Sequence, residues 1–293
     1  MKRFNSTCLM LAIASSFITG CIAISLSDQP SHQETRTLAI EHMPESSLSV
    51  VSENGSIDVA QSDGTQVRIS ARIKAVSEER LKAVQIIAMR TANNTLELYA
   101  DWPMPGRKSN EGCDFQIQIP DAAGIRLRSS NGRLAIERLA GQADLQTSNG
   151  SIAIRQHRGS STAQTSNGAI RVDEVAGTLH LRSSNGQIDV QGAAGEVKGQ
   201  TSNGNVRVAL AEGSAGPIEA RTSNGSVKLE LTQSFVGELI MQTSLGSIDI
   251  KDMPQARLIA SRRNFLQLGF GSGGPTSHAS TSNGSITVRM KKD

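Results

Sequence analysis

The sequence predicts an all-β protein, a parallel β-solenoid (β-helix-like) with rungs of about 18 residues. Three observations support this class: a Thr-Ser-Asn-Gly motif recurs, its spacing is constant over part of the chain, and alternating aliphatic residues follow it. From Asn131 to Asn203, four successive steps are 18 residues each. The motif, with Ser in place of Thr in two copies, stands at Ser129–Gly132, Thr147–Gly150, Thr165–Gly168, Ser183–Gly186, Thr201–Gly204, Thr222–Gly225 and Thr281–Gly284.

Each repeat is predicted to run as a strand, a sharp corner, a strand, a second corner and a strand. Aliphatic residues stand three and five positions after the Asn, for example Ile152 and Ile154, and a second inward position lies four before it. This alternation indicates short half-buried strands. Asn-Gly is expected to form the corner because both residues tolerate positive φ, and a Gly ten residues later, such as Gly159, marks the second corner.

Two architectures fit these strands. Asn-Gly between alternating strands is also a hairpin signal, which would give an antiparallel meander. We favour parallel stacking because the same residue type recurs at the same phase of every repeat, so that aliphatics lie on aliphatics and the Asn amides can form a ladder.

The first residues predict an export signal. Lys2 and Arg3 precede an apolar run, and Ile18–Cys21 resembles the bacterial lipobox, which implies cleavage before Cys21 and lipid attachment to its thiol. An uncleaved anchor over Leu9–Leu26 is the alternative. The residue after the Cys is Ile22, whereas an Asp at this position would suggest retention in the inner membrane. The outer membrane is therefore the expected location in a Gram-negative cell.

Charge and cysteine content argue against a nucleic-acid-binding protein and against a fold held by disulfides. Loss of two basic residues with the signal leaves 28 Lys and Arg against 27 Asp and Glu, without a basic block, which argues against a nucleic-acid partner. With Cys8 removed and Cys21 acylated, Cys113 stands alone, so no intrachain disulfide is expected. Cys113 itself is interpreted as a buried small apolar group.

We divide the chain into a signal peptide (1–20), a tether (21–37), an N-terminal β region that starts or caps the solenoid (38–120) and the repeats (121–293). In the N-terminal region, Ser77–Val84 is a short helix candidate. A hairpin is predicted from Gln85–Met89 and Thr95–Tyr99. Trp102, on a loop rich in Pro and Gly, is either a partner contact or a cover over the end of the solenoid, and we favour the cover.

The 18-residue spacing of the repeats ends after Asn203. Two insertions, 213–217 and 233–237, are expected to bulge from one corner, and Leu245 replaces an Asn. Residues 261–266 are interpreted as a degenerate rung, and the charged C-terminus as an open edge strand. The least repetitive surface gives further candidate contact residues: Arg262, Arg263, Phe265 and Phe270.

No motif for catalysis, a metal or a cofactor is present. The five histidines lack metal-ligand spacing, and the serines have no general base nearby in sequence. The expectation is a protein that is not an enzyme and binds no cofactor.

The repeats, the Phe115–Pro120 strand and the lipobox together resemble the bacterial β-strand-repeat domain of unknown function that carries the label "putative adhesin". The resemblance covers roughly residues 38–290 and implies a β-solenoid of the cell envelope, without catalytic or binding residues to transfer. The expected function is therefore a lipid-anchored surface for binding an envelope protein or a glycan. The alternatives are an envelope-stress sensor or regulator and a glycan-processing β-helix enzyme.

Overall fold

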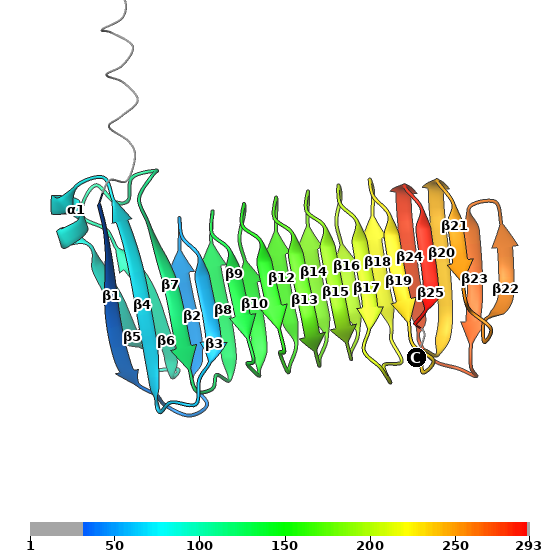
Figure 1. The fold of residues 1–293 in the computed structure, drawn as a ribbon, viewed down its shortest axis with the longest axis horizontal. Helices are drawn as coiled ribbons and strands as arrows, with labels where there is room; N and C mark the ends of the chain where they lie inside the picture. Colours follow the sequence, from blue (N-terminus) through cyan, green and yellow to red (C-terminus); the bar gives the residue numbers. More distant parts are fainter. Residues whose placement is uncertain (1–31, 292–293) are drawn as a thin grey trace, which may run out of the picture.

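The structure, a computed structural model, describes residues 32–291, which form an all-β rod of two long sheets (Figure 1). Sheet A has 12 strands and sheet B has 13. At about 4.8 Å per strand, the longer sheet is roughly 60 Å long. The predicted signal peptide and Cys21 lie outside the described residues.

The chain alternates between the two sheets, so that one coil contains two strands and two corners. The regular coils place these strands in sheet B: β8 (Gly124–Ser129), β10 (Gln142–Gln146), β12 (Ser161–Thr165), β14 (Leu179–Ser183), β16 (Val197–Gln200) and β18 (Ile218–Thr222). They place these in sheet A: β9 (Leu134–Glu137), β11 (Ile152–Arg155), β13 (Ile170–Val175), β15 (Ile188–Ala193), β17 (Val206–Leu210) and β19 (Val227–Leu231). The third strand of each predicted unit is the first strand of the next coil.

Successive coils stack in parallel with like residues side by side. In sheet A, Ile152 pairs with both Leu134 and Ile170, and in sheet B, Leu145 pairs with Ala163. The parallel arrangement and the phase of the repeats are confirmed, and the antiparallel meander is excluded for these coils. The inward aliphatic positions form a continuous buried core between the sheets, which at about 25 cal/mol per Å² of buried apolar surface supplies the main stabilising term.

The N-terminal end begins with a coil that joins this stack directly. Its strands β2 (Ser47–Ser52) and β3 (Ile57–Gln61) pair with β8 and β9. Beyond it, sheet A continues through β7 (Gly112–Ile119), β4 (Gln66–Ala75) and β1 (His32–Glu41), and sheet B through β6 (Thr95–Asp101) and β5 (Gln85–Arg90). β1 begins inside the segment predicted as a tether, and β5 and β6 form the predicted hairpin.

Helix α1 (Glu78–Ala83) covers this end together with the loop before β7 (Figure 1). The Ser77 hydroxyl accepts a hydrogen bond from the Arg80 amide at 3.3 Å. The Arg80 guanidinium lies 2.7 Å from the fully buried carboxylate of Glu111. Burial raises the pKa of Glu111, but hydrogen bonds from Arg80 and from the amides of Lys108 and Val76 outweigh it and bring the pKa to about 2.

The C-terminal strands depart from the sequential order. The last coil, β24 (Thr276–Asn283) and β25 (Ile286–Met290), is inserted between the coil of β18 and β19 and the coil of β20 (Gly237–Leu245) and β21 (Ile248–Lys251). β25 pairs with β19 and β21, so the prediction that the charged C-terminus forms an edge strand is wrong.

The predicted degenerate rung at 261–266 is also wrong. Residues 257–270 form an antiparallel hairpin, β22 (Arg257–Arg262) and β23 (Phe265–Phe270), which extends sheet B beyond β20. The turn at 263–264 reverses the chain within one sheet, whereas a rung would cross to the other sheet. Of the two predicted insertions, the second packs inward: its Phe235 is buried edge-on against Phe270, with the ring centres 5.1 Å apart.

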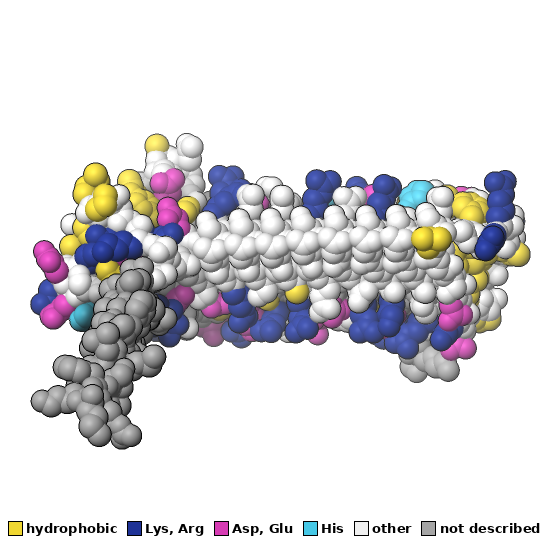
Figure 2. Space-filling view, turned by 90° about the horizontal axis from the view of Figure 1, so that it is seen from above, with side chains coloured by type: hydrophobic (Ala, Val, Ile, Leu, Met, Phe, Trp, Pro, Cys, Tyr) yellow, Lys and Arg dark blue, Asp and Glu magenta, His cyan; other side chains and the backbone are white. Residues whose placement is uncertain are grey.

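The Asn side chains of the corners form the predicted ladder. The Asn149 amide donates to the Asn131 carbonyl oxygen at 2.7 Å, and the series continues through Asn167, Asn185, Asn203, Asn224 and Asn283. The corners that carry this ladder form a ridge along the rod. Figure 2 looks down on this ridge, which is an uncharged band bordered by charged side chains. The inserted last coil keeps the ladder unbroken, and Leu245 stacks beyond its end.

Inside the ridge, hydroxyl groups link the coils. Thr165 Oγ1 donates to the Gly150 carbonyl of the preceding coil at 2.9 Å and accepts from its own Gly168 amide at 3.1 Å. The glycine is required by space: a Cβ on Gly168 would lie 1.8 Å from the Gly150 oxygen. The expectation of positive φ at these Asn-Gly corners is wrong, because none of their Asn or Gly residues between 131 and 284 has it.

Positive φ occurs instead at the second corner. The residue seven after the Asn is left-handed in four successive coils, at Arg138, Gln156, Glu174 and Gly192, with φ of 57°, 49°, 55° and 67°. The predicted second-corner glycine is also left-handed in Gly159, with φ of 138°. These corners turn each strand of sheet A back toward sheet B.

Candidate functional site

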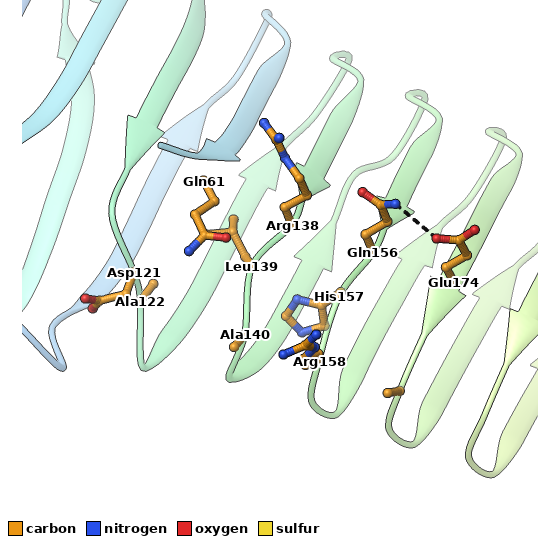
Figure 3. A pocket seen from close by; sticks show the side chains of 11 residues that line it. Gln61, Asp121, Ala122, Arg138, Leu139, Ala140, Gln156, His157, Arg158 and Glu174 are labelled. Carbon is orange, nitrogen blue, oxygen red and sulfur yellow. Dashed lines mark hydrogen bonds between the residues drawn. The ribbon is translucent and has the colours of Figure 1, made fainter. Parts of the chain in front are cut away.

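A polar recess of about 520 Å³ lies along the second corners of the N-terminal coils (Figure 3). Gln61 enters it from the end of β3, Asp121 from the segment after β7, and the left-handed residues Arg138, Gln156 and Glu174 from successive corners. Gln156 donates to Glu174 at 3.0 Å, as the dashed line in Figure 3 shows. The recess is therefore lined by side chains from successive coils, two of which are bridged by this hydrogen bond.

His157 lines this recess but belongs to the core. It occupies the buried position eight after the Asn, which is Leu139 in the coil before and Val175 in the coil after. Its Nε2 lies 3.0 Å from the Gly141 carbonyl, and its Nδ1 is buried without a well-aligned partner. Burial lowers the pKa of His157, so the ring is neutral at pH 7 and is not placed to exchange protons with a ligand.

The outer face of sheet B carries a second polar surface, which we call the trough. Two adjoining recesses of about 280 and 570 Å³ share Gln164, Arg182 and Gln200, which pair side by side on β12, β14 and β16. Arg221 on β18 extends the row. Hydroxyl groups of the corners border the larger recess, among them Ser166, Ser184, Ser202 and Ser223.

Arg182 is the cation of the trough that remains available. Arg221 lies 2.9 Å from Glu219, which also accepts from Gln200 at 3.2 Å, and Lys198 lies 2.7 Å from Glu196. Within residues 32–291, Arg182 has no ion-pair or hydrogen-bond partner, and its side chain is exposed. A guanidinium beside amides and hydroxyls is suited to bind a carboxylate or phosphate group together with neutral hydroxyl groups.

Sequence reasoning missed the trough, although the repeats contain its signal. The residue three before the Asn is Arg or Gln in six successive copies, at Arg128, Gln146, Gln164, Arg182, Gln200 and Arg221. Because strand side chains alternate between faces, this position must point outward when the residue four before the Asn points into the core. The row could therefore have been predicted from the repeat alignment.

The contact residues predicted from sequence do not form one surface. Trp102 is half-buried and packs against the core, and Phe270 is buried beside Phe235. Phe265 is half-buried, whereas Arg262 and Arg263 are exposed at the turn of the distal hairpin.

Other reactive groups are enclosed or dispersed. Burial raises the pKa of the Cys113 thiol to about 12, and its side chain is buried, as predicted. Among residues 32–291, no cluster of His, Cys, Asp and Glu side chains could hold a metal ion. That range also holds no helix with the length and apolar content needed to span a bilayer.

Comparison with models of known protein families finds a match over most of the chain. The sequence model of the Toastrack DUF4097 family matches residues 45–289. None of the curated proteins matches this chain.

Solved structures resemble the whole rod at low identity. A "putative adhesin" from Bacteroides fragilis is 17% identical, with a TM-score of 0.50 over 90% of this chain and 99% of its own. Another from Parabacteroides distasonis is 11% identical (TM-score 0.43, 90% and 98% covered), and a "putative lipid binding protein" from the same species is 14% identical (TM-score 0.37, 90% and 99% covered). The first likeness supports the fold alone. Because the family match spans most of the chain, this protein belongs to the Toastrack DUF4097 family.

Proposed function

We propose that this protein is a lipid-anchored, non-enzymatic protein of the cell envelope that presents its rod for adhesion, with the trough as the contact for an acidic glycan. The observation that carries the proposal is the unpaired Arg182 between Gln164 and Gln200 on a flat sheet face. The parallel strands keep these side chains at a spacing of about 4.8 Å. Such a fixed row suits a ligand that is itself a linear repeat of charged and hydroxyl groups.

The trough is tested by measuring binding of the full-length chain, in detergent micelles, to polygalacturonate and to neutral dextran. We expect binding to polygalacturonate alone, weakened by added salt because exposed charges are screened. Arg182→Ala should weaken it about tenfold through loss of a charged hydrogen bond. The control is Arg171→Ala, an exposed arginine on the outer face of sheet A.

Two results would contradict the glycan contact: equal affinity for dextran, or equal effects of the two substitutions. Any turnover of either polysaccharide would contradict the non-enzymatic part of the proposal. These measurements concern the trough and leave the anchor to a separate test.

The anchor is tested by metabolic labelling with a fatty-acid analogue. Wild-type protein should incorporate the label and Cys21→Ala should not, because the thiol is the expected site of attachment. Equal labelling of the two proteins would remove the lipid anchor from the proposal.

A further inference from the structure

The distal end of the rod is built asymmetrically. β20 and β21 form the coil at this end, and sheet A stops at β21. Sheet B continues through β23 and β22, so the hairpin projects as a single layer beyond the coil of β20 and β21 (Figure 1). Sheet A therefore has no strand at the two positions that face β23 and β22.

The inner face of this hairpin and the end of β21 expose apolar side chains, which we call the end shelf: Ile250, Leu258 and Leu266. Leu258 is 60% exposed and Ile250 is 38% exposed, although the residue equivalent to Ile250 in the preceding coils is fully buried. Leu266 is half-buried on β23, where it pairs with the buried Met241. Exposed apolar side chains gathered at one end of a protein mark an interaction surface.

The end shelf also has two strand edges without a neighbour, β21 in sheet A and β22 in sheet B. β22 runs in the same direction as β20, because both are antiparallel to β23. β21 runs in the opposite direction, because the corner at residues 246–247 reverses the chain between the sheets.

We propose that the end shelf joins two copies of this chain tip to tip in a two-fold lap joint. A two-fold axis parallel to the strands exchanges the levels of sheets A and B and preserves strand direction. The projecting hairpin of each copy then fills the two empty positions of the other. β22 of one copy lies antiparallel beside β21 of its partner, and each β22 closes over the partner's β23, which buries Leu258 and Leu266 on both sides.

Charge favours this arrangement over pairing of β22 with itself. In an antiparallel pair centred on β22, Arg257 would face Arg262 of the other copy, and like charges opposite each other destabilise a sheet. β21 instead carries Asp249 and Lys251, which lie 3.3 Å apart as an ion pair, so the basic β22 would meet a neutral pair there and avoid the repulsion between arginines. The interface is isologous, so it closes at two copies and does not continue into a fibre.

The joint places the two β1 strands at opposite ends of a doubled rod, because β1 is the edge strand at the far end of sheet A. Two rods anchored through their N-termini would thus meet by their free tips. This proposal does not depend on the trough and holds whether or not a glycan binds there.

The test is the protein mass of the full-length chain in detergent, measured by light scattering with the detergent contribution subtracted. Wild type at roughly 100 µM, well above the Kd of a micromolar interface, should have twice the monomer mass. Over a dilution series from about 1 to 100 µM, Leu258→Asp should raise the Kd of association about tenfold or more, because the joint would bury an unpaired charge. The control is Val51→Asp, at an exposed apolar residue near the other end.

Circular dichroism and thermal unfolding establish that each variant retains its fold. A monomeric wild type overturns the proposal, and so does a Kd that Leu258→Asp leaves unchanged or that Val51→Asp raises equally. Glycan binding is absent from this measurement, so its outcome is separate from that of the trough.

Discussion

At the scale of single residues, the Asn-Gly corner shows how a sequence signal can be correct for another reason. The corner glycines are needed because a carbonyl of the preceding coil occupies the space of a Cβ, and not because of their dihedral angles. A single sequence cannot separate these causes, since both select glycine. The distinction determines what a substitution does.

Gly168→Ala should lower the free energy of unfolding by about 3 kcal/mol, because the added methyl group forces neighbouring coils apart. Urea unfolding of the full-length chain measures this change. Gly64→Ala is the control, because the nearest atom to its added Cβ would be 3.9 Å away. Equal losses in the two variants would show that the stacking distance is not what requires the glycine.

His157 gives the protein a dependence on pH. The pKa of its ring is lowered in the folded state from its ordinary value of 6.5, chiefly by burial. As pH falls below about 6.5, the unfolded chain takes up a proton that the folded chain resists, so stability decreases until the lowered folded pKa is reached. At higher pH both states are neutral and this contribution vanishes.

His157→Leu should remove this part of the pH dependence, because Leu139 shows that leucine fits the same position of the preceding coil. The measurement is the difference in unfolding free energy between wild type and variant from pH 8 to pH 5. That difference should shift in favour of the variant as pH falls. A difference that is constant over the range would refute a neutral buried ring.

At the scale of elements, the Asn ladder ends where the sequence changes. Asn283 is the last amide of the series, and the next coil presents Leu245, which is 72% exposed. On one side this position is paired with Asn283, and on the other side no further coil follows. An Asn at this position could therefore bond only to Asn283, whereas the Asn residues inside the ladder bond on both sides.

Leu245→Asn should extend the ladder by one hydrogen bond, to the side-chain oxygen of Asn283, and raise the free energy of unfolding by about 1 kcal/mol. Thermal unfolding of the full-length chain checks this. The matched control is Met104→Asn, at a side chain that is 89% exposed and away from the ladder. A gain in both variants would indicate a general effect of surface polarity.

The sequence was sufficient to predict which positions of the coils stack on one another, but not the order in which the coils follow along the rod. Asn283 stands at the right phase for stacking on Asn224, but no period reveals that residues 237–270 lie beyond it. Phase depends on local alternation, whereas order depends on contacts between segments far apart in the chain. For the same reason the sequence predicts a rung where β22 and β23 form a hairpin.

The trough was only partly accessible to prediction. The Arg and Gln row can be read from the repeats, but the ion pairs that occupy Arg221 and Lys198 depend on Glu219 and Glu196 from neighbouring positions. Only the three-dimensional arrangement separates Arg182 from the other cations. The end shelf could not be predicted at all, because it follows from the unequal extent of the two sheets.

At the scale of the whole molecule, the rod behaves as a stack of nearest-neighbour units. Deleting residues 150–167 removes one coil of 18 residues and joins Asn149 to Gly168, which restores the motif. This variant should keep its β-sheet circular dichroism and unfold in a single transition. Deleting residues 150–158 removes half a coil, exchanges the sheets of all following strands, and should abolish cooperative unfolding. Similar behaviour of the two deletions would contradict a stack of equal coils.

The inserted position of β24 and β25 sets an order of events during synthesis. The coils from β8 to β19 can close one after another as the chain emerges, since each adds to one already in place. β20 and β21 cannot, because the strands on which they stack, β24 and β25, follow them in the chain. The tip of the rod therefore assembles only after residues 276–290 are available, and a chain truncated before Thr276 should form the coils up to β19 but leave β20 and β21 without the strands on which they stack.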